Sequence, residues 1–311
     1  MTPRTSRRAL LAGGLGGLGL AAVSSCAGSL SPATPPSVPP SAPPSSQPAQ
    51  AALAALEASF GGRIGAYALD TGNGATVGHR ADERFAMCST FKVLAASAIL
   101  RLRTAQPGLL DRRVRYRREQ LVTGAPVTGQ HVSDGMTVWQ LCAAAITHSD
   151  NTAANLLLDI LGGPAQVTAF ARTLGDPITR LDRVEPELNV VPPGEERDTS
   201  TPAQMAANLR TLVLGDALDP AGRDLLSGWL LANTTGGTRI QAGLPTGWRV
   251  GDKTGTGTSG EANDIAVTWP PGRQPLIISV YTAPTDPTAQ PNNKVVASAA
   301  ATLAKALVAP S

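Results

Sequence analysis

The stretch MCSTFKVLAASAIL, residues 87–100, places a lysine inside an otherwise apolar run. Apolar runs of this kind are usually buried, and a lysine is almost never fully buried unless a partner balances its charge. Lys92 follows Ser89 by three residues, so a helix that begins near Ser89 would put both side chains on one face. A buried lysine with a lowered pKa can accept a serine proton, which predicts a nucleophile and its base. The alternative is a lysine that reaches past the apolar surface to solvent.

The basic side chains of the chain are mostly arginines. Of 26 basic residues, only Lys92, Lys253, Lys294 and Lys305 are lysines. Because lysine can lose its proton in a suitable pocket and arginine cannot, a lysine at an apolar position indicates proton transfer. Removing the first 25 residues takes away three arginines and no acid, which leaves 23 basic against 23 acidic residues. A near-neutral chain has no general electrostatic reason to bind nucleic acid or an anionic membrane.

The N-terminal segment, residues 1–26, has the pattern of an export signal. Arg7 and Arg8 precede an apolar stretch that is too short for a typical membrane-spanning helix, and the pair resembles a twin-arginine signal. The sequence VSSC resembles a lipobox that would attach the protein to a membrane through a lipidated Cys26. Cleavage of a plain signal peptide nearby is the alternative. Residues 27–50, rich in proline and serine, predict a disordered linker, so we expect an exported protein.

The pattern of the remaining chain, residues 51–311, predicts one catalytic domain with two lobes. Alternating segments near both ends of this region read as strands, and the spacing between them is mostly helical. These patterns favour one mixed sheet in an α/β lobe made of residues 51–85 and 233–311, with a helical lobe, residues 86–232, inserted. We expect the active site in the cleft between the lobes.

The strongest basic run is DRRVRYRREQ, residues 111–120. A nucleic-acid patch is one interpretation. The interpretation that the near-neutral charge favours is a solvated edge, with Val114 and Tyr116 turned inward.

The histidines do not indicate a metal centre. His79, His131 and His148 form no HxH or HExxH pattern and no cluster, so the sequence predicts neither a metal nor another cofactor. Without a suitable histidine base, a Ser-His-Asp triad is also disfavoured.

Three further motifs follow Ser89 and Lys92 in the chain. They are SDN at residues 149–151, RVEPELN at residues 183–189 and KTGTG at residues 253–257. Each motif alone is weak evidence, because short patterns arise by chance. SxxK, SDN and KTG in this order are the set found in class A β-lactamases and penicillin-binding proteins.

The RVEPELN segment decides between those two groups, because it resembles the omega loop of class A serine β-lactamases. The resemblance covers the chain from about Ala51 to the C-terminus. It implies an α+β fold of the β-lactamase/transpeptidase type, in which both chain ends build an antiparallel sheet and an all-α lobe is inserted. It also implies a monomer that hydrolyses the β-lactam ring of penicillins and cephalosporins without a cofactor and so gives antibiotic resistance.

The resemblance also implies roles for the first two motifs. Ser89 would attack the lactam carbonyl and form an acyl-enzyme, with either Lys92 or Glu185, acting through water, as the base. Ser149 would pass a proton to the lactam nitrogen, and Asn151 would contact Lys92 and the substrate. The backbone N–H groups of Ser89 and Thr256 would form the oxyanion hole.

The two later motifs would complete the site. Glu185 would activate the water that cleaves the acyl-enzyme, Asn189 would hold that water, and the Glu185–Pro186 bond would be cis. An ion pair of Arg183 with Asp198 would close the neck of the loop. The substrate carboxylate would be bound by residues of the KTGTG segment and one arginine, namely Lys253, Thr254, Gly255, Thr256 and Arg239. The alternative for Arg239 is an ordinary surface position.

Two other classes of protein share part of this pattern. A penicillin-binding carboxypeptidase or transpeptidase would form a similar acyl-enzyme but would lack the deacylating glutamate. A non-catalytic β-lactam sensor would lack the deacylation residues and would be joined to a membrane-spanning signalling segment. Glu185 and Asn189 argue against both alternatives.

Overall fold

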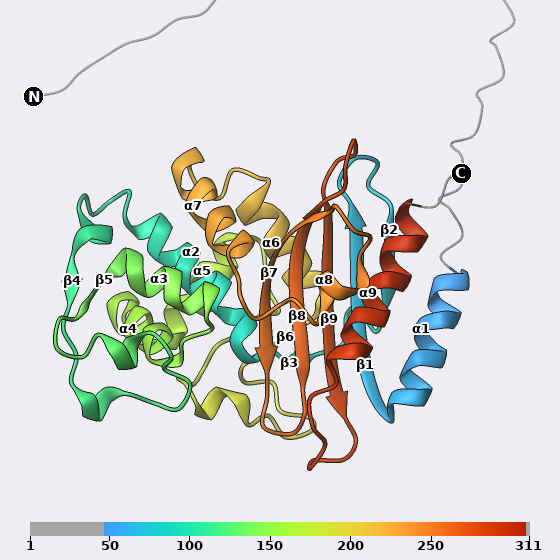
Figure 1. The fold of residues 1–311 in the computed structure, drawn as a ribbon, viewed down its shortest axis with the longest axis horizontal. Helices are drawn as coiled ribbons and strands as arrows, with labels where there is room; N and C mark the ends of the chain where they lie inside the picture. Colours follow the sequence, from blue (N-terminus) through green and yellow to red (C-terminus); the bar gives the residue numbers. More distant parts are fainter. Residues whose placement is uncertain (1–46, 309–311) are drawn as a thin grey trace, which may run out of the picture. The chain divides into compact units, whose positions relative to one another are not determined.

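In the computed structural model, which describes residues 47–308, a five-stranded sheet is flanked by helices (Figure 1). The strand order is β2-β1-β9-β8-β7 and every pairing is antiparallel. The mixed sheet that the strand patterns favoured is therefore wrong, and the antiparallel sheet that the family resemblance implied is present. The strands are β1 (Gly62–Asp70), β2 (Thr76–His79), β7 (Arg249–Thr256), β8 (Ala262–Trp269) and β9 (Leu276–Pro284).

The first helix begins earlier than the sequence patterns predicted. Helix α1 starts at Gln47, so the last four residues assigned to the linker are helical. The export signal, the rest of the linker and Cys26 lie outside the described residues. The helices are α1 (Gln47–Phe60), α2 (Lys92–Leu102), α3 (Val138–Thr147), α4 (Asn151–Leu161), α5 (Pro164–Thr173), α6 (Pro202–Val213), α7 (Pro220–Leu231), α8 (Ile240–Gly243) and α9 (Asn293–Val308).

Short strand pairs and single 3₁₀ turns lie outside the main sheet. The antiparallel pair β3 (Phe85–Ala86) and β6 (Thr199–Ser200) joins the ends of two segments that are far apart in the chain. A second pair, β4 (Arg113–Val114) and β5 (Met136–Thr137), forms the outer edge of the helical lobe (Figure 1). Single turns of 3₁₀-helix occur at Cys88–Phe91, Leu109–Asp111, Arg118–Gln120, Thr128–Gln130 and Glu187–Asn189.

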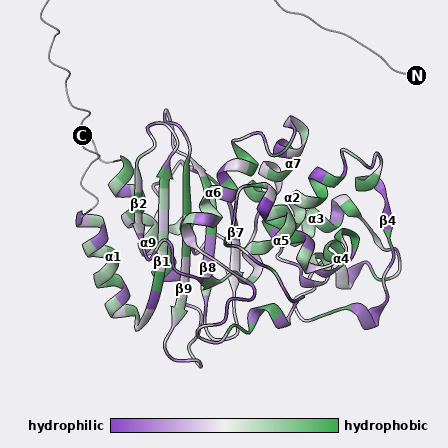
Figure 2. Ribbon diagram, turned by 180° about the vertical axis from the view of Figure 1, so that it is seen from behind, coloured by the Kyte–Doolittle hydropathy of each residue, from purple (hydrophilic) through white to green (hydrophobic). Residues whose placement is uncertain are grey.

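The sheet separates two apolar cores because successive side chains of a strand point to opposite faces. Ile265 and Val267 of β8 pack with the helical lobe, whereas Ala266 between them packs with α1 and α9. In β9, Ile277 and Ile278 divide between the two cores in the same way. Figure 2 shows long hydrophobic stretches in these central strands and in the helices that cover them. The sheet between the two cores thus combines β1 and β2 with β7, β8 and β9, from near both ends of the described chain.

Helix α2 lies at the centre of the helical lobe. Every residue from Lys92 to Leu100 is buried, so the helix has no solvent-facing side over this length. Fully burying a side chain such as Ile99 contributes roughly 1.5–3 kcal/mol. The apolar run therefore fixes the helix, and Lys92 at its first residue is held in the interior.

The basic run at the outer edge matches the solvated-edge prediction. Tyr116 is buried and Val114 is half-buried, whereas the five arginines of the run are exposed: Arg112, Arg113, Arg115, Arg117 and Arg118. Among the helices of residues 47–308, none combines the length and apolar character that crossing a membrane would require.

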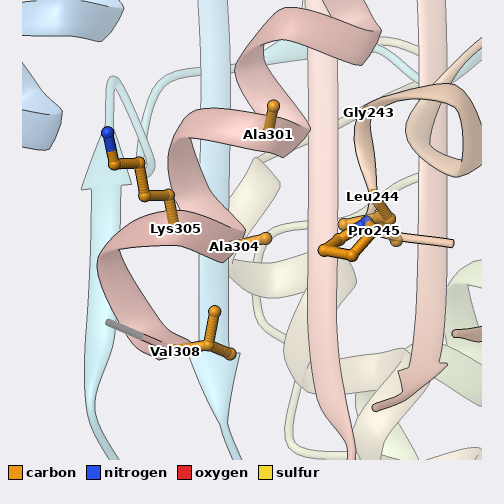
Figure 3. A pocket seen from close by; sticks show the side chains of 7 residues that line it. All are labelled: Gly243, Leu244, Pro245, Ala301, Ala304, Lys305 and Val308. Carbon is orange, nitrogen blue, oxygen red and sulfur yellow. The ribbon is translucent and has the colours of Figure 1, made fainter. Parts of the chain in front are cut away.

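A hollow of about 420 Å³ lies beside helix α9 (Figure 3). The end of α8 and the loop after it form one wall, and α9 forms the other. None of the motif residues lines it, so it is separate from the candidate site. Its lining residues are Gly243, Leu244, Pro245, Ala301, Ala304, Lys305 and Val308.

Helix α1 is fastened to the sheet by a charged cluster around Glu57. The Glu57 carboxylate accepts hydrogen bonds from Arg80 at 2.6 and 2.8 Å, from the Ile64 N–H at 2.9 Å and from His79 at 3.1 Å. Burial alone would raise the pKa of Glu57, but the hydrogen bonds from Arg80, Ile64 and His79 outweigh it and lower the pKa to about 2. The ionised form therefore stabilises the fold.

We expect Glu57→Gln to destabilise the protein in a pH-dependent way. The folded pKa of Glu57 lies below the ordinary value of 4.5, so its contribution is complete above that pH and is lost as the pH falls towards 2. Thermal melts should show a loss of up to roughly 3 kcal/mol at pH 7 that shrinks in acid. Glu119→Gln, at an exposed position, is the control. A deficit that stays constant down to pH 2 would contradict this assignment.

Candidate active site

The four motifs meet where the two lobes join. Ser89 lies in the 3₁₀ turn Cys88–Phe91 that leads into α2, and Lys92 is the first residue of that helix. Ser149 precedes the start of α4, which carries Asn151 at its first position. Lys253 comes from β7, the edge strand nearest the helical lobe, and Glu185 from the loop between α5 and α6.

Lys92 is fully buried, and its ammonium has three partners. Nζ donates to the backbone oxygen of Ser149 at 2.8 Å and to Oδ1 of Asn151 at 2.6 Å. It also lies 3.0 Å from Oε1 of Glu185. The alternative of a lysine that reaches past the apolar surface to solvent is therefore wrong, because the charge stays inside the protein and is balanced there.

The Ser89 hydroxyl reaches the same glutamate oxygen. Its Oγ donates to Oε1 of Glu185 at 3.3 Å. The i, i+3 spacing predicted a shared face for Ser89 and Lys92, and the structure connects the two side chains through Glu185. A proton that leaves Ser89 thus has Glu185 and Lys92 along one short path.

A second lysine–serine contact lies on the other side of the site. Lys253 is fully buried, and its Nζ donates to Oγ of Ser149 at 2.9 Å and to the Thr254 carbonyl at 2.7 Å. The Lys92 ammonium is 3.5 Å from the same hydroxyl. Ser149 has a φ of 56°, an uncommon conformation for a residue with a side chain. This strained backbone places its hydroxyl between two ammonium groups.

The backbone of Glu185 is clamped by Asn155, one turn along α4 from Asn151. The side-chain Oδ1 of Asn155 accepts from the Glu185 N–H at 2.9 Å, and Nδ2 donates to the Glu185 carbonyl at 2.8 Å. Oε2 of Glu185 accepts from Asn189 Nδ2 at 2.5 Å. The Glu185–Pro186 bond is cis, as the family resemblance implied. Oδ1 of Asn189 is buried and has no hydrogen-bond partner among the described residues.

The ion pair expected at the neck of the loop is present. Nε of Arg183 lies 2.5 Å from Oδ2 of Asp198, and the Asp198 side chain is fully buried. Oδ1 of Asp198 also accepts the N–H groups of Asp182 and Arg183, at 2.7 and 3.0 Å. These bonds close the loop that carries Glu185.

Arg239 lies behind strand β7 and is not the surface residue that the alternative described. It is buried, and Nη1 donates to the carbonyl oxygens of Gly255 and Asn263 at 2.6 and 2.7 Å. Its Nε donates to Asn293 at 2.9 Å and Nη2 to Oγ1 of Thr256 at 2.6 Å. Most of its donors are therefore used within the protein, and its direct effect is to orient Thr256, which is exposed.

Burial acts on the charges of this site. It lowers the pKa of Lys92, and the neighbouring Glu185 carboxylate partly opposes that shift. Burial, and after it the positive charge of Lys92, holds the pKa of Lys253 well below its ordinary value. Both amines therefore release a proton more readily than an exposed lysine does.

The described residues hold no cluster of three metal-ligating side chains of the His, Cys, Asp and Glu types. The chemistry of the site is that of a serine hydroxyl, two amines and a carboxylate.

Several residues that build the site were missed by sequence reasoning. Asp150 is fully buried and accepts from the N–H groups of Val127, Thr128 and Ala153 at 2.8 to 2.9 Å. Asn233 and Thr235 hold Thr254: Thr235 Oγ1 lies 2.6 Å from Thr254 Oγ1 and donates to Asn233 at 2.9 Å. Asn155 could have been found, because it stands four residues after Asn151 on the same helix face.

Fold and site together are those of a serine acyl-transfer enzyme in which a lysine and a glutamate, and no histidine, contact the serine and its neighbours among the residues assigned here. The profile of the Beta-lactamase enzyme family matches residues 48–307. The chain is 55% identical over 304 residues to Beta-lactamase FAR-1 of Nocardia farcinica, covering 98% of this chain and 95% of that protein. It is 51% identical over 248 residues to the Carbapenem-hydrolyzing beta-lactamase KPC of Klebsiella oxytoca, covering 79% and 85%.

A solved structure agrees with this placement. The class A beta-lactamase from Mycobacterium abscessus is 56% identical, with a TM-score of 0.82, covering 84% of this chain and 100% of that chain. The chain belongs to the class A serine β-lactamases.

We expect Asn155→Ala to loosen the loop that carries Glu185. The change removes two hydrogen bonds to the Glu185 backbone, which should cost roughly 2 kcal/mol of unfolding free energy. Hydrogen exchange of residues 183–198 should become faster than in the parent. Asn73→Ala, which removes a bond in an exposed turn, is the control. Unchanged exchange in this loop would show that Asn155 does not hold it.

Proposed function

We propose that this protein hydrolyses the β-lactam ring of penicillins and cephalosporins through an acyl-enzyme on Ser89, and so gives antibiotic resistance. The observation that carries the proposal is the position of the Glu185 carboxylate. One of its oxygens accepts a hydrogen bond from Ser89 and forms an ion pair with Lys92, and the other accepts a hydrogen bond from Asn189. The same group can therefore serve both the formation and the cleavage of an ester on Ser89.

In the first step, Oγ of Ser89 bonds to the lactam carbonyl carbon and its proton passes to the Glu185 and Lys92 pair. Both routes remain open, because Oε1 of Glu185 is the acceptor of the Ser89 hydroxyl and also the partner of the Lys92 ammonium. The backbone N–H groups of Ser89 and Thr256 would stabilise the oxyanion. Losing one such donor typically costs about 3 kcal/mol of barrier lowering.

The C–N bond then breaks and the ring nitrogen takes a proton. Ser149 is the donor of this proton, because its hydroxyl lies 2.9 Å from Lys253 and 3.5 Å from Lys92. Either ammonium can replace the proton that Ser149 gives away.

The substrate carboxylate would lie along the edge of β7. Lys253 supplies the positive charge, and the hydroxyls of Thr254 and Thr256 supply hydrogen bonds. Gly255 lets the strand pass close to the serine turn, since a side chain there would come within 2.8 Å of the Met87 carbonyl. Arg239 contributes through Thr256.

Hydrolysis of the ester completes the cycle. Glu185 takes a proton from a water, and the resulting hydroxide attacks the ester carbon. The bond between that carbon and Oγ of Ser89 then breaks, Glu185 returns its proton to Oγ, and the acid product leaves. Nδ2 of Asn189 holds the carboxylate, and its buried Oδ1 faces no protein donor among the described residues and is suited to accept from that water. A penicillin-binding transpeptidase or a β-lactam sensor would not need Glu185 and Asn189 to hold and activate a water.

The location and assembly of the protein are also part of the proposal. Arg7, Arg8 and the apolar stretch after them support export, and Cys26 supports attachment to the cell envelope by a lipid. We expect the catalytic domain to act as a monomer, as the family resemblance implies. Inhibition of lipoprotein signal peptidase would block processing if Cys26 is lipidated.

Replacement of Glu185 tests the proposed function directly. The parent should turn over a chromogenic cephalosporin rapidly, whereas Glu185→Gln should be impaired by several orders of magnitude, because its amide cannot accept a proton from water. Intact-mass measurement should reveal an adduct on Ser89. Glu187→Gln, at an exposed position two residues away, should behave as the parent. A folded parent without turnover would rule out the β-lactamase assignment.

Replacement of Lys253 tests the charge at the carboxylate site. The lowered pKa means that Lys253 loses its charge at a lower pH than an exposed lysine, so kcat/KM should fall on the alkaline side. Lys253→Arg should move this alkaline limb to higher pH, because a guanidinium keeps its proton. The control is Lys294→Arg, which lies outside the site. Superimposable alkaline limbs would show that another group sets them.

A further inference from the structure

The outer edge of the helical lobe presents a concentrated positive charge that catalysis does not use. We call residues 112–118 the arginine edge: it contains Arg112, Arg113, Arg115, Arg117 and Arg118, all exposed. The acids next to it are Asp111 and Glu119, so the run is strongly positive although the chain without residues 1–25 is near neutral. The edge is therefore a local feature.

The arginines of this edge differ from most others in how they are paired. Most of the other described arginines lie close to carboxylates, as in Arg63 with Glu83 at 2.9 Å and Arg180 with Asp182 at 2.6 Å. In the edge, only Arg117 has such a neighbour, Glu119 at 3.8 Å. The other four have no carboxylate within 4.0 Å in residues 47–308. An external anion can therefore approach them without displacing an internal partner.

The edge is built on an ordered support. Strand β4 pairs with β5, and the hydroxyl of buried Tyr116 donates to the Thr128 carbonyl at 2.8 Å. Arg113 donates to the Gly135 carbonyl at 3.0 Å. Because alternate residues of an extended segment share a side, the inward Val114 and Tyr116 turn Arg115, which lies between them, outward. The backbone that carries the arginines is thus ordered before any partner binds.

An exposed tryptophan follows the residue whose backbone contacts Arg112. The Val138 N–H donates to the Arg112 carbonyl at 3.0 Å, and the next residue is Trp139. Trp139 is 42% exposed and only partly covered by Trp229, whose ring lies 6.0 Å away. Tryptophan is enriched where proteins meet the interface of a bilayer, because its ring suits the headgroup region.

We propose that the arginine edge and Trp139 dock on the surface of a bilayer that contains anionic phospholipids. Arginine binds phosphate groups in a bidentate manner, and basic residues near an anionic bilayer each increase binding roughly fivefold. Trp139 favours a lipid surface over a soluble polyanion, which offers no apolar region for an indole. This proposal does not depend on the hydrolytic function, because none of these residues belongs to the active site.

Vesicle co-sedimentation of the fragment 47–311 tests the proposal without interference from the N-terminal apolar stretch. The solved Mycobacterium abscessus chain corresponds in full to 84% of this chain, which indicates that the domain folds alone. We expect the fragment to bind vesicles of phosphatidylglycerol and phosphatidylcholine, and not vesicles of phosphatidylcholine alone. Binding should weaken as salt is added.

Matched variants separate the edge from total charge. Arg112→Gln, Arg115→Gln and Arg118→Gln together should reduce binding on the order of 100-fold. Arg63→Gln, Arg210→Gln and Arg249→Gln together remove the same charge from exposed positions in other elements and should keep most of the binding. Both triple variants should retain turnover of a chromogenic cephalosporin and the parent melting temperature, which checks the fold.

Trp139 distinguishes a bilayer from a soluble polyanion. Trp139→Ala should weaken vesicle binding but not affect retention on immobilised polyphosphate. No binding to anionic vesicles, or equal losses in the two triple variants, would overturn the proposal. Polyphosphate that binds the parent more tightly than the vesicles do, with no effect of Trp139→Ala on either, would assign the edge to a soluble anion and overturn it as well.

Discussion

The contact between the Lys92 ammonium and the Glu185 carboxylate is the constraint on which the site depends. Both groups are buried, and a buried ion pair regains its lost hydration only with good geometry and additional hydrogen bonds. The protein supplies these bonds from three separate segments of the chain. The Lys92 ammonium also donates hydrogen bonds to Asn151 and to the Ser149 carbonyl, and the Glu185 carboxylate accepts one from Asn189. Loss of either charge would leave the other uncompensated in the interior.

The rest of the fold follows from the need to bring these segments together. Helix α2 is buried along most of its length, so the apolar run that seemed incompatible with a lysine is what anchors it. The antiparallel sheet places β7 at the edge beside the serine turn, where Lys253 reaches Ser149. Two amines and a carboxylate then share a small volume, and burial, followed by the positive charge of Lys92, lowers the pKa of Lys253. The chemistry is possible because the charges are not exposed to water.

Motifs in the sequence indicated Ser89, Lys92 and Glu185, which the structure brings together, but not most of the groups that hold them. Ser89, Lys92 and Glu185 are revealed by motifs because their chemistry restricts the residue type. Asn233 acts through an ordinary hydrogen bond that many polar side chains could make, so no short pattern marks it. Asn155 is marked only by its spacing of four residues from Asn151, which gives no role by itself. The family resemblance implied a role for Arg239, but only the structure reveals that its guanidinium is directed mainly at backbone carbonyls and a threonine.

The fold was predicted to a similar extent. Strands at both ends and helices between them followed from periodicity, because side-chain direction alternates in strands and repeats with the helical turn. The pairing direction did not follow, since alternation along a strand carries no information about its neighbour. The start of α1 was also missed, because Gln47 and Pro48 continue the composition of the linker before it.

Helix α4 fixes the spacing between the contact to Lys92 and the contact to the backbone of Glu185. Its first residue, Asn151, touches Lys92, and its fifth, Asn155, grips the backbone of Glu185, about 6 Å further along the axis. One residue inserted between them would rotate the grip by about 100° and detach it. Residues 190–197 are mostly exposed and come after the part of the loop that Asn155 holds. Residues 190–197 can therefore vary in length or sequence while the distance between Lys92 and Glu185 stays the same.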